Sequence, residues 1–305
     1  MNYLSSTKKS FLNKKTRSNL FIISALLLPI IHFFIFWVLV NFNSILMAFQ
    51  RFNVKTGKEY FTLANFTDIP VVFNKYGKVL EGLKNTTLTW AFQLFLLQPW
   101  GFLLTFFIYK KIPLHGVWRT YLFIPALLPA VAMTSIFSYI LLPGAPVGQF
   151  LSLVTGKTPP MLLTDPKYAN STVIFYVFIT NFGGQFVLFS GAMGRISKEL
   201  VESAQLDGAN LGTELCKIVI PLCWPTISMI ILLNIAGFFA VSGPVLLLTE
   251  GDGGTFTMAY YFFTQTKGNT LYQPAAVGIM FTVILFPIVV IARRALGKVY
   301  ADVEF

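Results

Sequence analysis

Long apolar runs, almost free of charged residues, alternate with polar segments along the chain. The runs cover residues 19–42, 83–108, 120–142, 171–193, 224–248 and 274–292. An α-helix needs about 20 mostly apolar residues to cross the hydrocarbon core of a bilayer, so each run is a candidate span. The pattern therefore predicts an all-α membrane protein with six transmembrane helices.

The polar segment between the fourth and fifth runs has the residues of two short helices joined by a sharp turn. Ser197 is placed to cap the first helix, and Gly208 can take the left-handed conformation that often ends a helix. Asn210 can cap a second helix over 211–220, which Pro221 and Pro225 should end. We expect this helix pair to lie at a membrane surface.

The residues of this segment also carry a recognisable spacing. They are Glu202, Ser203, Ala204, Asp207, Gly208, Ala209, Ile218 and Pro221. The spacing resembles the signature loop of permease subunits in bacterial ABC importers, with Ser203 in place of the usual Ala. The resemblance implies that residues 194–223, here named the signature loop, form a cytoplasmic coupling helix that docks on a separate ATPase subunit. A helix pair with a glycine joint can move as a rigid lever and shift the two flanking spans.

Composition and charge agree with a multi-pass membrane protein. Hydrophobic residues make up 55% of the 305 residues and charged residues 11%, with a mean hydropathy of +0.68. These values exclude a water-soluble domain of this length. The net charge of +11 does not indicate nucleic acid as a partner, because Lys and Arg gather in short clusters beside the apolar runs, where they set orientation in the lipid bilayer.

The charge clusters predict the topology. They place a basic N-terminal segment 1–18 and a C-terminal segment 293–305 in the cytoplasm, on either side of a six-helix permease domain 19–292. The loop 43–82 is also basic and argues against this orientation, but it is long enough for its charge to count less. We therefore expect both termini and the signature loop inside.

The sequence lacks the motifs of catalysis and metal binding. The Gly-Lys-Thr segment at 156–158 and the glycine-rich segment at 251–254 do not have the spacing or context of nucleotide-binding loops. No Cys/His cluster, catalytic triad or paired carboxylates lie in a span, and Cys216 and Cys223 are expected to be inert thiols. Ion-coupled carriers usually have acidic or histidine side chains within their spans that change charge or coordinate cations, and in the apolar runs only His32 is of this kind. The chain is therefore predicted to have no catalytic or metal site and to be powered by other subunits.

The resemblance covers most of the chain and supplies the partners. It implies a second homologous permease subunit, two ATP-binding subunits that hold ATP and Mg²⁺, an extracytoplasmic solute-binding protein, and a bacterial cell membrane as the location. No cofactor is expected in this chain. Residues 61–66 and 249–263 resemble outer segments of sugar-importer permeases, the second being a glycine-rich stretch followed by a helix.

Uncharged amides and aromatic rings in the spans suit a sugar, which needs hydrogen-bond partners and a flat apolar surface. The candidate pathway residues are Asn181, Gln185, Asn234, Phe238, Tyr139 and Ser135. A spacing of four places Asn181 with Gln185, and Asn234 with Phe238, on shared helix faces. Buried amides that only bridge two helices are the alternative for these residues. For the whole chain, a secondary carrier or channel for a neutral solute, or a scaffold without a pathway, are the alternatives.

Overall fold

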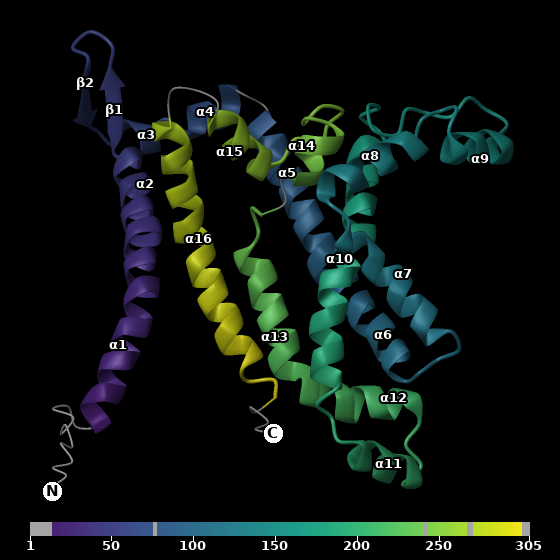
Figure 1. The fold of residues 1–305 in the computed structure, drawn as a ribbon. Coiled ribbons are helices and arrows are strands. Elements are labelled where there is room, and N and C mark those ends of the chain that lie inside the picture. The colour runs from purple at the N-terminus through teal and green to yellow at the C-terminus, as the bar shows by residue number, and fades with distance from the viewer. Residues whose placement is uncertain (1–13, 76–77, 241–242, 267–270, 301–305) are drawn as a thin grey trace, which may run out of the picture. The chain divides into compact units, whose positions relative to one another are not determined.

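A computed structural model describes residues 14–75, 78–240, 243–266 and 271–300 (Figure 1). The described residues form two compact units. Unit 1 contains residues up to 67 together with 271–279, and unit 2 contains residues 68–270 and those from 280 onward. Helix α16, Tyr272–Leu296, begins in unit 1 and continues in unit 2. Most of the N-terminal segment 1–18 lies outside the described residues.

Unit 1 begins with one long helical span. It is formed by α1 (Lys14–Phe33), the π-helix η1 (Phe34–Leu39) and α2 (Val40–Ala48). The span continues six residues beyond the predicted end at 42, because residues 43–48 remain largely apolar and continue the helix. An antiparallel hairpin of β1 (Gln50–Asn53) and β2 (Lys58–Phe61) follows, then the short helix α3 (Ala64–Thr67). The hairpin lies in a loop for which the sequence predicted no strand.

A buried asparagine holds unit 1 together. Asn65 is 1% exposed, and its side-chain Nδ2 donates to the carbonyl oxygens of Ala48 and Gln50 at 2.8 and 2.9 Å. Its Oδ1 accepts from Arg51 Nε at 2.6 Å, and Gln273 Nε2 donates to the Asn65 main-chain oxygen at 3.0 Å. These contacts fix the hairpin to the end of α2 and to the first turn of α16.

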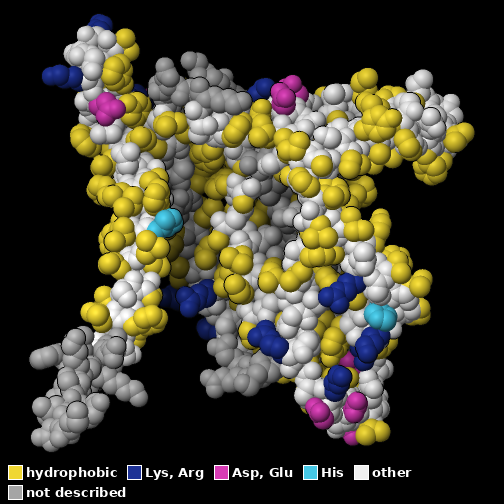
Figure 2. Space-filling view, in the orientation of Figure 1, with side chains coloured by type: hydrophobic (Ala, Val, Ile, Leu, Met, Phe, Trp, Pro, Cys, Tyr) yellow, Lys and Arg dark blue, Asp and Glu magenta, His cyan; other side chains and the backbone are white. Residues whose placement is uncertain are grey.

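Unit 2 contains the remaining helices. In chain order these are α4 (Ile69–Lys75), α5 (Lys78–Phe92), η2 (Gln93–Leu97), α6 (Gln98–Tyr109), α7 (His115–Leu127), α8 (Ala130–Ile140), α9 (Pro146–Thr155), α10 (Ala169–Met193), α11 (Lys198–Leu206), α12 (Leu211–Glu214), η3 (Leu215–Val219), α13 (Ile220–Ala236), α14 (Gly243–Leu248), α15 (Met258–Thr266) and the rest of α16. Apolar side chains cover the exposed flanks of its long helices, while charged side chains gather near the signature loop (Figure 2).

The described residues contain a candidate helix for each of the six predicted spans, the third in two pieces and the fifth with different bounds. Within the described residues, five helices are long and apolar enough to cross a membrane, and there is a sixth candidate if the bent pair α7–α8 is counted as one span. The pair is bent by 107° at the break between its two halves. Pro129 causes the break, because it lacks an N–H group and forces Leu128 into an extended conformation with φ −84° and ψ 141°.

The fifth span differs from the prediction. A continuous helix runs from Leu211 to Ala236, so the expected end of a short helix at Pro221 and the expected span 224–248 are both wrong. Pro221 lies inside this helix, directly after the π-helical segment η3, and such a local change of helical pitch accommodates a residue without an N–H group. The helix ends at Gly237, and α14 forms a separate short helix.

The glycine-rich segment ahead of α15 packs tightly against α5. Asn85 Nδ2 donates to the carbonyl oxygens of Gly254 and Phe256 at 2.8 and 2.9 Å. Gly253 has a φ of +63°, and a Cβ atom there would lie 3.0 Å from the Thr164 carbonyl oxygen, so both its conformation and its contact require glycine. The predicted sequence of a glycine-rich stretch and a following helix is confirmed.

Candidate functional site

The signature loop has the local geometry that its residues predict. Ser197 Oγ accepts from the Leu200 N–H group at 3.3 Å, and Asn210 Oδ1 accepts from the Thr213 N–H group at 2.8 Å, so both N-caps are confirmed. Gly208 has a φ of +84°, the left-handed conformation expected at the joint. The loop therefore turns sharply between two capped helices (Figure 1).

The signature residues divide into an exposed and a half-buried set. Those exposed to solvent are Glu202, Ser203, Asp207 and Gly208, whereas Ala204, Ala209, Ile218 and Pro221 are half-buried. Leu206, at the end of α11, is 90% exposed.

The opposite side of the loop is anchored in the core of unit 2. Val201 of α11 and Val219 of η3 are buried in one cluster with Phe106 of α6 and Met193 of α10. In addition, Glu214 is 1% exposed and forms an ion pair with Lys110 at 2.8 Å. Sequence reasoning missed this pair, because the two residues lie in different segments and no spacing links them.

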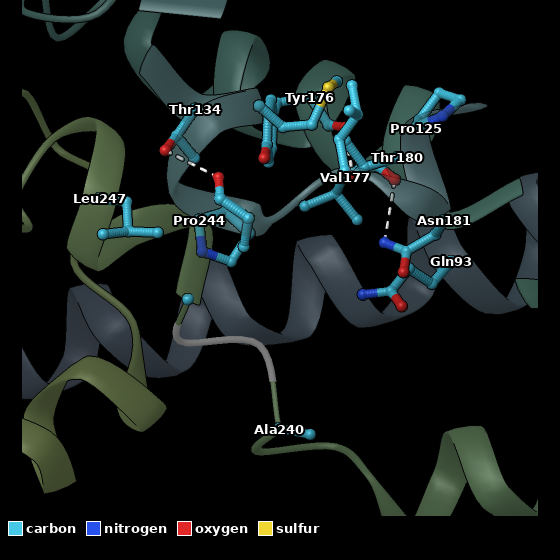
Figure 3. A pocket seen from close by; sticks show the side chains of 14 residues that line it. Gln93, Pro125, Thr134, Tyr176, Val177, Thr180, Asn181, Ala240, Pro244 and Leu247 are labelled. Atoms are coloured by element: carbon cyan, nitrogen blue, oxygen red, sulfur yellow. Dashed lines mark hydrogen bonds between the residues drawn. The ribbon is translucent and has the colours of Figure 1, made fainter. Parts of the chain in front are cut away.

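A cavity of about 390 Å³ lies among the helices of unit 2 (Figure 3). Its lining comes from the junction of α5 with η2, from α7, α8 and α10, and from the segments around Ala240 and Pro244. The break in the third span forms part of the wall, since Pro125, Leu128 and Ala130 all line the cavity.

The polar side chains of the cavity are neutral. Asn181 Nδ2 donates to the Val177 carbonyl oxygen at 2.9 Å, and the Thr134 and Thr180 hydroxyls donate within their own helices. Within the described part of the chain, the Gln93 amide and the Tyr176 hydroxyl have no hydrogen-bond partner, although Tyr176 is only 4% exposed. Figure 3 shows Gln93 and Asn181 among the residues that line the cavity. The cavity therefore offers both donors and acceptors to a bound solute, and no Asp, Glu, Lys, Arg or His is among the described residues that line it.

The other candidate pathway residues do not line this cavity. Gln185 is one turn from Asn181, but its Oε1 is buried without a partner and would lie 2.8 Å from a Cβ atom at Gly101. Ser135 and Tyr139 are exposed on α8, and Thr134 instead lines the cavity.

Asn234 and Phe238 meet at a residue that sequence reasoning did not consider. The expected shared helix face is wrong, because α13 ends at Ala236, before Phe238. Both residues nevertheless contact Trp90: its Nε1 donates to the Asn234 main-chain oxygen at 3.1 Å, and its ring centre lies 5.4 Å from that of Phe238. The Asn234 Oδ1 atom is buried without a partner.

Among the described residues, no group of three or more His, Cys, Asp and Glu side chains is arranged to hold a metal ion. Cys216 and Cys223 are free, the first exposed and the second buried. The site thus consists of a neutral cavity and a helical loop anchored on the same bundle. These features define an α-helical membrane protein with the architecture of a transport subunit.

Comparison with known families identifies the chain. Residues 98–301 match the family of binding-protein-dependent transport system inner membrane components, and the chain belongs to this family. It is 23% identical over 280 residues to the arabinooligosaccharides transport system permease protein AraP of Bacillus subtilis, covering 88% of this chain and 86% of AraP. It is 24% identical over 192 residues to the lactose transport system permease protein LacF of Rhizobium radiobacter, covering 61% of this chain and 64% of LacF.

The fold has a close counterpart among solved structures. A bacterial ABC transporter involved in the import of the acidic polysaccharide alginate contains a chain that matches with a TM-score of 0.79 and 22% sequence identity. The match covers 93% of this chain and 98% of that chain. At this level of identity the likeness establishes the fold alone.

Proposed function

We propose that this chain is a permease subunit of an ATP-driven importer for a sugar or oligosaccharide, located in a bacterial cell membrane. The signature loop carries the proposal. Its capped helices, left-handed glycine and exposed Leu206 present a protruding surface, while its other side is fixed to the spans. Such a surface is what a separate motor subunit needs in order to move the bundle.

The cavity supports a neutral polyhydroxyl substrate. Gln93, Asn181 and Tyr176 supply amide and hydroxyl groups, and the lining residues that the structure describes include no Lys, Arg or His to neutralise an anion. The names of AraP and LacF, which refer to arabinooligosaccharides and lactose, support a carbohydrate. The cavity would form part of the substrate pathway, shared with a second homologous permease.

The partners follow from the family and the loop. We expect two ATP-binding subunits to hold ATP and Mg²⁺ and to dock on the exposed face of the loop, including Glu202 and Asp207. We also expect an extracytoplasmic solute-binding protein, because the family of this chain is described as binding-protein-dependent. In this arrangement both termini and the signature loop face the cytoplasm, and the hairpin β1–β2 faces outward.

Reconstitution tests the proposal. The chain would be assembled with its second permease and ATP-binding subunits in vesicles, and uptake would be measured with labelled lactose, an arabinooligosaccharide and an alginate oligosaccharide in the presence of the solute-binding protein. We expect uptake of a neutral sugar that requires ATP on the loop side. Uptake by this chain without ATP-binding subunits would instead establish a secondary carrier or channel.

A further inference from the structure

The signature loop is fastened to the second span as well as to the fourth and fifth spans that flank it. Lys110 Nζ lies 2.9 and 2.8 Å from the two carboxylate oxygens of Glu214. Gln205 Nε2 adds a donor to the same carboxylate at 3.4 Å. One buried carboxylate therefore joins the end of α6 to both helices of the loop.

This joint resists separation. The Glu214 side chain is 1% exposed and that of Lys110 17% exposed, so neither charge can regain full hydration while the two elements stay packed. A buried carboxylate that loses its partner is strongly destabilised, which keeps the pair together during any motion that leaves the core intact. Val201 and Val219 belong to the same buried cluster as Phe106, so apolar packing acts in the same direction.

The second span is a continuous helix from Lys78 to Tyr109. Gln93 lies about halfway along it, in the cavity wall and at the first residue of the π-helical turn η2. Asn85, nearer the other end, binds the glycine-rich segment ahead of α15. One continuous helix thus connects Lys110 to the cavity wall, so that a displacement of Lys110 can reach Gln93 through it.

We propose that Lys110 and Glu214 are a positioning pair that passes motion of the signature loop to the second span, and through it to Gln93 in the cavity. The proposal rests on the proposed function, since it assumes that an ATPase moves the loop. Neither residue touches substrate or nucleotide. The chain itself joins the loop to the fourth and fifth spans, and the pair joins it in addition to the second span.

A thiol in the cavity wall reports this motion directly. Gln93→Cys would be introduced together with Cys216→Ser, which removes the exposed native thiol, while Cys223 is buried. The rate of alkylation by a maleimide would be measured in the assembled complex, first without nucleotide and then trapped with ATP, Mg²⁺ and vanadate. We expect the rate to change about tenfold on trapping, a typical size for coupling between two sites.

Adding Lys110→Met should abolish this change while the complex still hydrolyses ATP. The exchange Lys110→Glu with Glu214→Lys should restore it at least in part, because the pair is rebuilt in reverse. Lys298→Met removes an exposed lysine near the C-terminal end of α16 and should have no effect. If the Lys110→Met complex fails to assemble, Glu214→Gln takes its place, with a smaller loss expected because the amide oxygen still accepts from Lys110.

The outcomes separate the two proposals. A reference complex that neither hydrolyses ATP nor changes its alkylation rate on trapping would contradict the proposed function. A reference complex that responds to ATP, with Lys110→Met or Glu214→Gln responding to the same extent, would overturn the positioning role alone. Loss of the response with retained ATP hydrolysis, and its recovery in the exchange variant, would establish the role, because a merely structural defect would lower both activities together.

Discussion

The indole N–H group of Trp90 donates a hydrogen bond to the main-chain oxygen of Asn234 at 3.1 Å and joins the second span to the fifth. Trp90 is three residues before Gln93, which lines the cavity, and its ring also packs on Phe238 just beyond the end of α13. Through these two contacts, Trp90 holds the end of the fifth span beside the second span, which lines the cavity.

Replacing Trp90 should separate the contribution of its hydrogen bond to Asn234 from that of its ring contact with Phe238. Trp90→Phe keeps a ring against Phe238 but removes the N–H donor, and we expect a loss of about 1 kcal/mol in the free energy of unfolding. Trp90→Ala also removes the ring and should cost about 3–5 kcal/mol. Thermal unfolding of the detergent-solubilised protein measures both; equal losses in the two variants would show that the hydrogen bond, and not the ring, dominates.

Gly183 sits where α10 meets α7. A Cβ atom at this position would lie 2.5 Å from Ala126 Cβ and 3.3 Å from the Leu122 carbonyl oxygen, so Gly183→Ala must push the two helices apart. We expect it to destabilise the protein by about 1–3 kcal/mol. The neighbour Gly184 has open space around its Cβ position, and Gly184→Ala is the matched control.

The control should be neutral or slightly stabilising, because alanine favours the helix over glycine by about 1 kcal/mol. Combining Gly183→Ala with Ala126→Gly should recover most of the loss. A Gly183→Ala protein as stable as the Gly184→Ala protein would contradict the close approach of α7 and α10.

Substitutions of Asn181 and Gln185 should have different effects on uptake, although the two residues lie one turn apart on α10. Asn181 lines the cavity, so Asn181→Leu should lower the apparent affinity for the transported sugar about tenfold, the effect of losing one hydrogen bond. Gln185 Oε1 is buried without a partner, so Gln185→Met should leave uptake unchanged and stabilise the protein by about 1 kcal/mol. Concentration-dependent uptake and thermal unfolding test the pair; an uptake defect in Gln185→Met alone would place the pathway elsewhere.

Substitutions of Gly208, at the joint of the signature loop, should be poorly tolerated. Its Cβ position is open, but its φ of +84° is costly for other residues, so Gly208→Ala should lose about 1–2 kcal/mol without a steric clash. Gly208→Trp should add to this a block to ATPase docking, with ATP-driven uptake abolished and insertion retained. Normal uptake by Gly208→Trp, measured against Gly208→Ala, would refute the lever role of the loop.

Local patterns in the sequence were sufficient to predict several features of the fold. The apolar runs predicted six spans, and Ser197, Gly208 and Asn210 predicted the caps and the turn of the signature loop, because each of these depends on neighbouring residues only. The break at Pro129 and the continuation of the helix through Pro221 were not predicted. A proline can break a helix or be accommodated within one next to a π-helical segment, and the surrounding packing decides between the two.

The site was predicted less completely than the fold. Asn181 was a candidate and lines the cavity, whereas Gln93, Thr134 and Tyr176 become neighbours only when three spans pack together. Contacts such as Lys110 with Glu214 or Trp90 with Asn234 join residues more than 100 positions apart. Periodicity along one helix holds no information on such pairs.

A cross-link from the exposed tip of the signature loop tests the central claim most directly. Leu206→Cys, with Cys216→Ser, would be treated in sealed membranes with a thiol- and amine-reactive cross-linker in the presence of the ATP-binding subunits. The account predicts a covalent adduct between this chain and an ATP-binding subunit that is lost when Gly208→Trp is added. No adduct, together with labelling of the thiol at position 206 by an impermeant reagent from the outer side, would contradict it.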